Sequence, residues 1–263
     1  MNKNRRMGKI TIKHYLNKSL SNKEGKNVRQ TIYVQVTVKR QVNRMRSRAN
    51  KFAGLTEIEL QSTQQELDNS LAGGLDMGLG RGLSMENSII HDIITYLRPF
   101  DRDSFTLKAF TLIYEICTEE MLEVMSQAGK NFLRERMSDL WHQPFYILDW
   151  DKPYIELIGG LTELGEGNNA FNLTVLQDIN IECFNIAIEH YGEFLDASFN
   201  YEYLVDDYKG FLAFYWFKGE HTRMYLTYLE KNGHISGSQV PVMKRIFDDM
   251  YDSVITTIKE LSS

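Results

Sequence analysis

Five cationic side chains fall within a short stretch near the start of the chain: Lys39, Arg40, Arg44, Arg46 and Arg48. A guanidinium group presents its donors in a planar fork that matches phosphate or carboxylate oxygens. Arg44, Arg46 and Arg48 are spaced two residues apart, so on a strand they would project from one face and repel one another. The pattern therefore predicts that this group binds another macromolecule, either the phosphates of duplex DNA or the carboxylates of a protein.

The charge of the chain is divided unevenly along its length. Residues 1–51 contain 15 lysines and arginines and a single acid, Glu24, whereas residues 52–263 contain 15 lysines and arginines and 34 acids. Such asymmetry is typical of a basic segment that meets nucleic acid or an acidic surface. The acidic region of a neighbouring copy is one such surface, so self-assembly is an alternative to DNA binding.

Alternating apolar residues predict the elements that carry the cations. Residues 8–16, 31–39 and about 42–48 each alternate with a period of two, and Gly25 marks the turn region after the first of them. Three strands joined in this way form a small antiparallel sheet. We expect an α+β fold with a basic β arm domain at 1–52, a Gly/Leu-rich extended linker at 53–85 and a mainly helical C-terminal body at 86–263.

The expected linker contains five glycines between residues 73 and 82. Each interior glycine costs a helix about 1 kcal/mol relative to alanine, which favours a flexible, extended segment. The alternative is a segment that becomes ordered by docking on a partner, with leucines as anchors. The leucines recur every four residues, and the predicted docking set is Leu71, Leu75, Leu79 and Leu83.

The sequence of the acidic body, residues 86–263, predicts mainly helices. Ser84 or Asn87 is expected to cap its first helix, and an apolar face over residues 246–261 predicts its last. Residues 145–149 and 154–160 are expected to form two short strands. The aromatic residues between 199 and 217 are expected to be core rather than an exposed stacking surface.

Catalytic and metal-binding patterns are weak throughout the sequence. Asp149 and Asp151 begin like a calcium loop, but no glycine or distal glutamate follows at the required spacing. His190 and Glu193 form an isolated pair rather than an HExxH motif, and there is no GxSxG. We therefore expect a protein without enzymatic activity, with no catalytic residue, no metal site and no cofactor.

Compartment signals favour a cytoplasmic type of environment. Cys117 and Cys183 lie in apolar segments outside any CxxC motif, as expected for buried thiols in a reducing compartment. The basic N-terminal residues lack the apolar region of a secretory signal, and the apolar run at 211–217 is too short to span a bilayer. We expect no membrane partner and no secretion by a signal peptide.

The segments ITIKHYLN, NKEGKN and TIYVQVTVKRQVNRMRS resemble the amino-terminal arm-type DNA-binding domain of tyrosine recombinases from Bacteroidetes and their mobile elements. Residues 89–110 are similar to the first helices of the core-binding domain that follows it. The resemblance implies that residues 39–48 lie where the sheet of that domain approaches a DNA groove. Catalysis is not implied, because His221 is followed by Arg223 rather than by an arginine at position 224, and Tyr251 lies in an acidic helix.

Two functions fit these patterns. The first is a non-catalytic structural assembly protein of a bacteriophage virion, such as a neck or ring subunit of the head–tail connector type, whose basic arm docks on neighbouring chains. Its partners would be further copies and other protein subunits. The alternative is an accessory DNA-binding protein of a mobile element that binds duplex DNA through the sheet. The expected location is the virion or the bacterial host cytoplasm.

Overall fold

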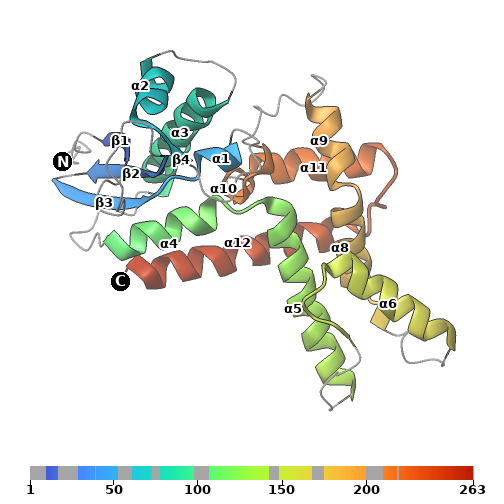
Figure 1. Ribbon diagram of the computed structural model, residues 1–263. Helices are drawn as coiled ribbons and strands as arrows, with labels where there is room; N and C mark the ends of the chain where they lie inside the picture. The colour runs from blue at the N-terminus through green and yellow to red at the C-terminus, as the bar shows by residue number, and fades with distance from the viewer. Residues whose placement is uncertain are drawn as a thin grey trace, which may run out of the picture. The chain divides into compact units, whose positions relative to one another are not determined.

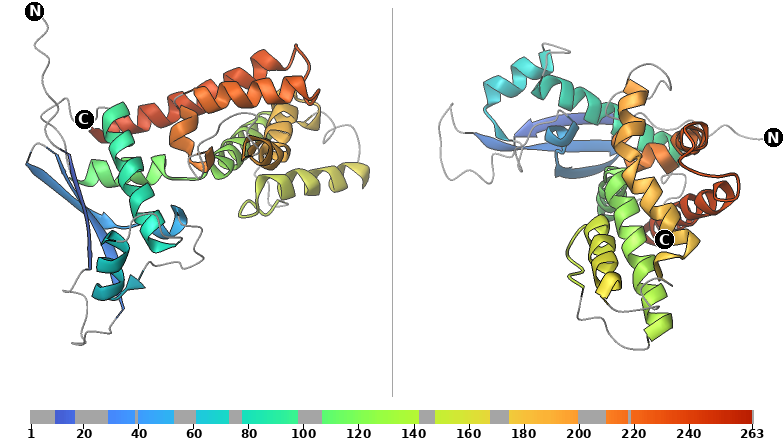
Figure 2. Two further views of the ribbon diagram at one scale, coloured as in Figure 1. Left: turned by 90° about the horizontal axis from the view of Figure 1, so that it is seen from above. Right: turned by 90° about the vertical axis from the view of Figure 1, so that its right-hand side faces the viewer.

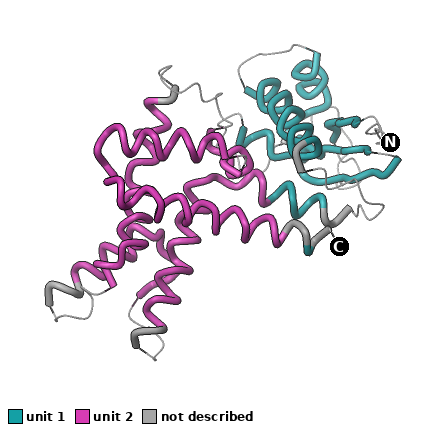
Figure 3. Tube along the Cα trace, turned by 180° about the vertical axis from the view of Figure 1, so that it is seen from behind, with its two compact units in different colours: residues 1–115, 258–263 teal, residues 116–257 magenta. Residues whose placement is uncertain are grey.

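A computed structural model describes residues 10–16, 29–38, 40–52, 61–72, 78–97, 107–141, 148–167, 175–199, 210–217 and 219–262 (Figure 1). The chain divides into two compact units, which Figure 3 colours separately. Unit 1 comprises residues 1–115 and 258–263, and unit 2 comprises residues 116–257. This division falls at residue 115 rather than near residue 85, and the two helices that follow residue 78 are grouped mainly with the sheet.

Unit 1 contains the predicted antiparallel sheet in the order β1-β2-β3. The strands are β1 (Thr11–Leu16), β2 (Gln30–Val38) and β3 (Gln41–Arg46), and β4 (Gln61–Ser62) pairs with the start of β2. Val38 pairs with Gln41, so only two residues connect β2 to β3. The α+β prediction, with an N-terminal sheet and a mostly helical body, is confirmed.

Helices cover one face of the sheet. They are α1 (Ala49–Phe52), α2 (Gln64–Ala72), α3 (Leu79–Leu97) and α4 (Leu107–Cys117). The left panel of Figure 2 shows α2 and α3 on the same side of the three strands. The apolar cluster between these layers consists of Leu16, Ile32, Ala49, Leu67 and Leu83, with Leu79 packed against it.

The expected extended linker is wrong where the structure describes it, because α2 and the start of α3 lie within residues 53–85. A reciprocal cap begins α2: Thr63 N–H donates to Glu66 Oε2 at 2.9 Å, and Glu66 N–H donates to Thr63 Oγ1 at 3.2 Å. A threonine followed three residues later by a glutamate is a local signal for the start of a helix. The sequence-based prediction gave more weight to the nearby glycines and therefore missed this helix.

Helix α3 begins earlier than predicted, so Ser84 lies inside it rather than at its cap. Gly80 and Gly82 each oppose a helix by about 1 kcal/mol. Burying a leucine contributes about 1.5–3 kcal/mol, and both Leu79 and Leu83 pack on the apolar cluster of unit 1. Packing on the sheet therefore outweighs the cost of the glycines. Local helix propensity alone placed the start of α3 too late in the sequence.

Unit 2 is helical in every described element except one isolated bridge pair. The helices are α5 (Met121–Trp141), α6 (Tyr154–Gly167), α8 (Ile179–Glu189), α9 (Tyr191–Phe199), α10 (Ala213–Phe217), α11 (Glu220–Lys231) and α12 (Val240–Ser262), whose last residues belong to unit 1. The strand expected at 154–160 is wrong, because the buried residues Tyr154, Leu157 and Leu161 follow helical spacing. Most of the other expected strand, residues 145–147, lies outside the described residues. None of the described helices is long and apolar enough to cross a membrane.

Aromatic rings fill the core of unit 2. Trp216 stacks on Phe247 with centroids 5.9 Å apart, and its indole N–H donates to Gly210 O at 2.8 Å. Tyr225 is fully buried and donates to Ala187 O at 2.6 Å. For the described part of the aromatic segment, residues 210–217, the core interpretation is confirmed. Residues 200–209 lie outside the described part.

Candidate nucleic-acid interface

The sheet has one buried face and one face open to solvent. On β2 the even-numbered residues from Ile32 to Val38 are buried, while the odd-numbered residues are only partly covered. The strand register places the outward residues of β1 and β3 beside them. We call this surface the open face, and it consists of Thr11, Lys13, Tyr15, Thr31, Tyr33, Gln35, Thr37, Val42, Arg44 and Arg46.

Two rows of cations and polar or aromatic groups cross the open face. One row pairs Lys13 with Gln35 and Gln35 with Arg44, whose Nε donates to Gln35 Oε1 at 3.1 Å. Since β1, β2 and β3 contain no aspartate or glutamate, nothing within the strands neutralises these cations.

The second row is aromatic. It pairs Tyr15 with Tyr33 and Tyr33 with Arg46, and the two tyrosine rings lie 6.1 Å apart between centroids. Partial burial raises the pKa of Tyr15, while the nearby positive charge of Arg44 acts in the opposite direction. The phenol is therefore neutral near pH 7, and the row offers hydroxyl groups and ring faces beside a guanidinium.

The five predicted cations do not form one surface. Arg44 and Arg46 project from the open face and are exposed, whereas Arg40 lies in the turn after β2 with a positive φ of 71°. Lys39 lies outside the described residues. Arg48 follows the end of β3, where the strand alternation no longer applies, so the predicted row of three arginines is wrong at this position.

Arg48 is held against the helices by main-chain and side-chain contacts. Its N–H donates to Glu86 Oε1 at 2.7 Å, and its guanidinium donates to Glu115 O at 3.2 Å. The role of Arg48 is therefore to join the end of β3 to α3 and α4, rather than to extend the open face.

The carboxylate of Glu86 on α3 is fully buried and accepts four hydrogen bonds. Besides Arg48, the donors are Tyr114 Oη at 2.5 Å, Ser47 Oγ at 2.5 Å and His14 Nε2 at 2.7 Å. We call this group the Glu86 cluster. It links β1, the end of β3, α3 and α4 through one anion, and it satisfies the lone pairs of both carboxylate oxygens.

The Glu86 cluster is built for positioning rather than for nucleophilic catalysis. In a catalytic triad the histidine lies between the nucleophile and the carboxylate, but here Ser47 and His14 both point to the same oxygen of Glu86. Burial, followed by the charge of Glu86, raises the pKa of Tyr114 well above its usual range. The cluster therefore fixes the sheet on its supporting helices.

The predicted docking leucines also separate. Leu83 is 2% exposed and Leu79 packs against the same apolar cluster, so both anchor their own helix rather than a neighbouring chain. Leu71 on α2 is 49% exposed, and Leu75 lies outside the described residues. For Leu79 and Leu83, the four-residue spacing therefore reflects packing of α3 within its own unit.

Sequence reasoning missed several residues of this site. Lys13, Tyr15, Tyr33 and Gln35 share the open face because of the strand register, although their alternation was visible. Glu86 carried a weaker signal, a single acid near the start of the apolar run that includes Ile89 and Ile90. Its four donors come from distant segments, so no local pattern could identify the cluster.

Unit 2 contains a separate group of potential metal ligands. His190, Glu193 and His234 form the one group of three or more histidine, cysteine, aspartate or glutamate side chains that meets metal-ligand spacing within the described residues. His190 and Glu193 are therefore not the isolated pair that the sequence indicated.

No protein-family model matches the chain, and no curated protein and no solved structure is detectably similar to it. Function is therefore inferred from the residues and their geometry.

Proposed function

We propose that unit 1 binds duplex DNA through the open face of its sheet. The observation that carries the proposal is the cross-strand arrangement of Lys13, Arg44 and Arg46 around Gln35 and Tyr33, in strands without any acid. Lysine and arginine supply phosphate contacts, and arginine and glutamine also hydrogen-bond base edges.

The dimensions of the sheet suit a DNA groove. Neighbouring strands lie about 4.8 Å apart, so the three strands span about 10 Å between the outer two. The major groove of B-DNA is about 12 Å wide and admits a two-stranded β-ribbon, and some proteins place strands of a β-sheet in a groove. A face of this width with cations on both outer strands allows central residues to approach bases while the cations approach phosphates.

Support from the interior keeps such a face rigid. The Glu86 cluster ties both outer strands to helices through His14 on β1 and Ser47 after β3. Rigid placement reduces the conformational entropy that is lost on binding, which improves affinity without new contacts.

Binding of a labelled duplex by the full chain tests the proposal. The test variant combines Arg44→Ala and Arg46→Ala, and the charge-matched control combines Arg223→Ala and Lys244→Ala, which are exposed on unit 2. We expect the test variant to lose affinity about tenfold or more, since each arginine contact is worth about 1–3 kcal/mol, and the control to bind as the wild type does. Equal binding by all three proteins would overturn the proposal.

A second proposal, structural assembly, is favoured by the acidic side chains of unit 2. A groove of about 780 Å³ is lined by apolar residues, including Val124, Phe132 and Met250, and by the exposed acids Glu123, Glu135 and Asp249. Charge complementarity suits contact between these acids and the cations of unit 1 in a second copy. A neck or ring subunit of a phage virion would use such a contact to join neighbouring copies.

Light scattering on the full chain separates the two proposals. Assembly predicts a concentration-dependent mass that falls when Glu123, Glu135 and Asp249 are replaced by the corresponding amides. DNA binding through the same cations predicts that duplex DNA competes with assembly. A monomer at all concentrations would exclude the assembly proposal and leave DNA binding untouched.

A further inference from the structure

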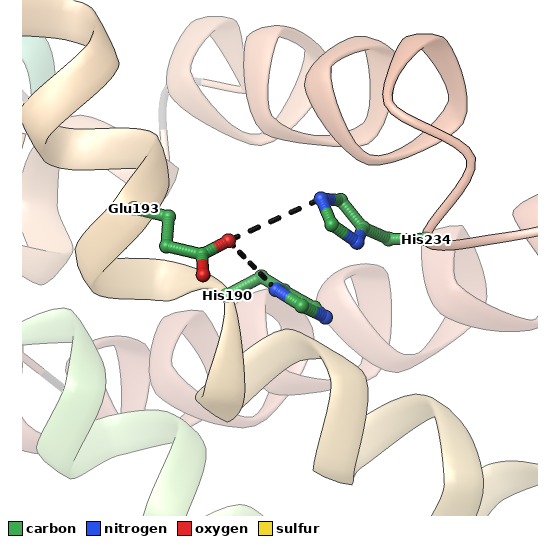
Figure 4. A group of neighbouring side chains, drawn as sticks. All are labelled: His190, Glu193 and His234. Atoms are coloured by element: carbon green, nitrogen blue, oxygen red, sulfur yellow. Dashed lines mark hydrogen bonds and ion pairs between the residues drawn. The ribbon is translucent and has the colours of Figure 1, made fainter.

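Three side chains of unit 2 lie close together: His190 and Glu193 from the junction of α8 and α9, and His234 from the segment after α11 (Figure 4). His190 Nδ1 lies 2.9 Å from Glu193 Oε2, and His234 Nε2 lies 4.0 Å from the same oxygen. The two imidazole rings stack with centroids 3.7 Å apart and an interplanar angle of 26°. Figure 4 shows the Glu193 carboxylate facing both rings, so two nitrogens and one oxygen approach a common space.

Helix ends fix the first two ligands. His190 ends α8, where its N–H donates to Ile186 O at 3.1 Å, and its own carbonyl accepts from Phe194 N–H in the first turn of α9. Glu193 lies in that same first turn. Both ligands therefore sit on a backbone that is already ordered.

A glycine-terminated helix end fixes the third ligand. After α11, Gly233 has a φ of 74°, and its N–H donates to Glu230 O at 3.1 Å. His234 N–H donates to Leu229 O at 2.9 Å. This pair of bonds is a Schellman motif. The sequence Asn232-Gly233-His234 therefore stops α11 and places the His234 side chain beside α8 and α9.

We propose that His190, Glu193 and His234 bind a divalent transition-metal ion of the Zn²⁺ class. Two imidazoles and one carboxylate are a ligand set that suits Zn²⁺, whereas Ca²⁺ and Mg²⁺ prefer oxygen ligands only. The site lies wholly within unit 2, so it does not depend on the proposed DNA-binding face.

The distances require only a small adjustment. Zn²⁺ binds nitrogen and oxygen at about 2.0–2.2 Å, which places tetrahedral donors about 3.3 Å apart. Here the donor atoms lie within 4.8 Å of one another, and one pair is already at 2.9 Å. The His234 ring must tilt out of the stack to direct Nε2 at the ion. The side chains of His234 and Glu193 are 25% and 60% exposed, so both have room to move and a water molecule can complete the coordination.

Bound metal would join three helix ends that the chain otherwise holds by packing and caps. In place of the direct contact between His190 and Glu193, the ion would bond to His190, Glu193 and His234. Binding energy of this kind stabilises the folded state because the unfolded chain does not hold His234 beside His190 and Glu193. The expected consequence is a metal-dependent rise in the thermal stability of unit 2.

The proposal is tested by titrating the chelator-treated full chain with ZnCl₂ and measuring the heat of binding by calorimetry. In a second titration, CoCl₂ gives a visible absorbance signal for the same site. The variants are His234→Asn and Glu193→Gln. The matched control is His91→Asn, which removes an exposed histidine from α3. Circular dichroism confirms that each variant is folded, and Glu193→Gln remains informative if His234→Asn perturbs the loop.

We expect one equivalent of Zn²⁺ to bind the wild type and the His91 variant, with no competition from MgCl₂. Removing a ligand should weaken binding about 100-fold or more, because even second-layer partners of metal ligands contribute 10–100-fold. Absence of saturable binding by the wild type, or wild-type affinity in both ligand variants, would overturn the proposal. The three side chains would then serve only as hydrogen-bonded and stacked groups at a helix junction.

Discussion

His14 Nε2 lies 2.7 Å from Glu86 Oε2, which joins the first strand to α3 across 72 residues of sequence. Both side chains are buried, with exposed fractions of 1% and 0%. A carboxylate in such a place is tolerated because four donors surround it, and the loss of any matching partner leaves a buried polar group unsatisfied. The order of unit 1 should therefore depend on this one anion.

The substitution Glu86→Gln should destabilise unit 1 by at least about 1–3 kcal/mol, the cost of leaving one buried donor without its acceptor. The new amide would present a donor where donors already point. Urea unfolding followed by far-UV circular dichroism measures the change. Glu163→Gln, which removes an exposed carboxylate from α6, should shift stability by no more than about 0.5 kcal/mol. A tolerated Glu86→Gln would mean that the cluster is not an anchor.

Salt dependence should report the number of phosphate contacts made by the open face. Each neutralised phosphate contributes about −0.9 to the slope of log K against log salt concentration on duplex DNA. Replacing Arg44 and Arg46 together by alanine should make the slope less steep by about 1.8 if both contact phosphates. The measurement is fluorescence anisotropy of a labelled duplex at several salt concentrations. An unchanged slope with weaker binding would assign these arginines to base contacts instead.

Two glycine-to-alanine substitutions in unit 2, at Gly129 and Gly159, should change the free energy of unfolding in opposite directions. A Cβ added at Gly129 on α5 would lie 2.9 Å from two carbon atoms of the buried Tyr154 ring, whereas one added at Gly159 on α6 meets nothing within 4 Å. Gly129→Ala should destabilise by about 1–3 kcal/mol through overpacking. Gly159→Ala should stabilise by up to about 1 kcal/mol through helix propensity. Thermal unfolding of the two variants measures both, and a stabilised Gly129→Ala would show that α5 and α6 pack less closely.

Both cysteine thiols should be unreactive in the native protein at pH 8. Burial raises the pKa of Cys117 to about 12 and that of Cys183 to about 11, from about 9 for an accessible thiol. Both thiols stay protonated in the folded state while they ionise in the unfolded state, so their contribution to stability is complete below pH 9. That contribution falls as the pH rises from about 9 to about 12.

A thiol-reactive dye tests this at pH 8, with and without denaturant. We expect slow labelling of the native chain and rapid labelling of two thiols after unfolding. Fast labelling of the native chain would place at least one cysteine at an accessible, ionisable position.

The three strands could be predicted because alternation is a local property of the chain, and β1, β2 and β3 lie within a few residues of the predicted ranges. The helix at 79–85 could not be predicted from the same kind of signal. Its glycines oppose a helix locally, and only the apolar cluster that includes Leu16 and Ile32 reverses that preference.

The amino-acid sequence by itself determined the basic first fifth of the chain, the period of its strands, and the buried character of the aromatic residues at 214–217 and of Cys117 and Cys183. Tertiary structure alone decided that Arg48 turns from the open face to Glu86, and that His234 lies beside His190 and Glu193. The physical reason is the distance along the chain over which each kind of information acts. Alternation and charge are read from neighbouring residues, but hydrogen bonds and metal ligands depend on distances between segments that only the packed helices and strands establish.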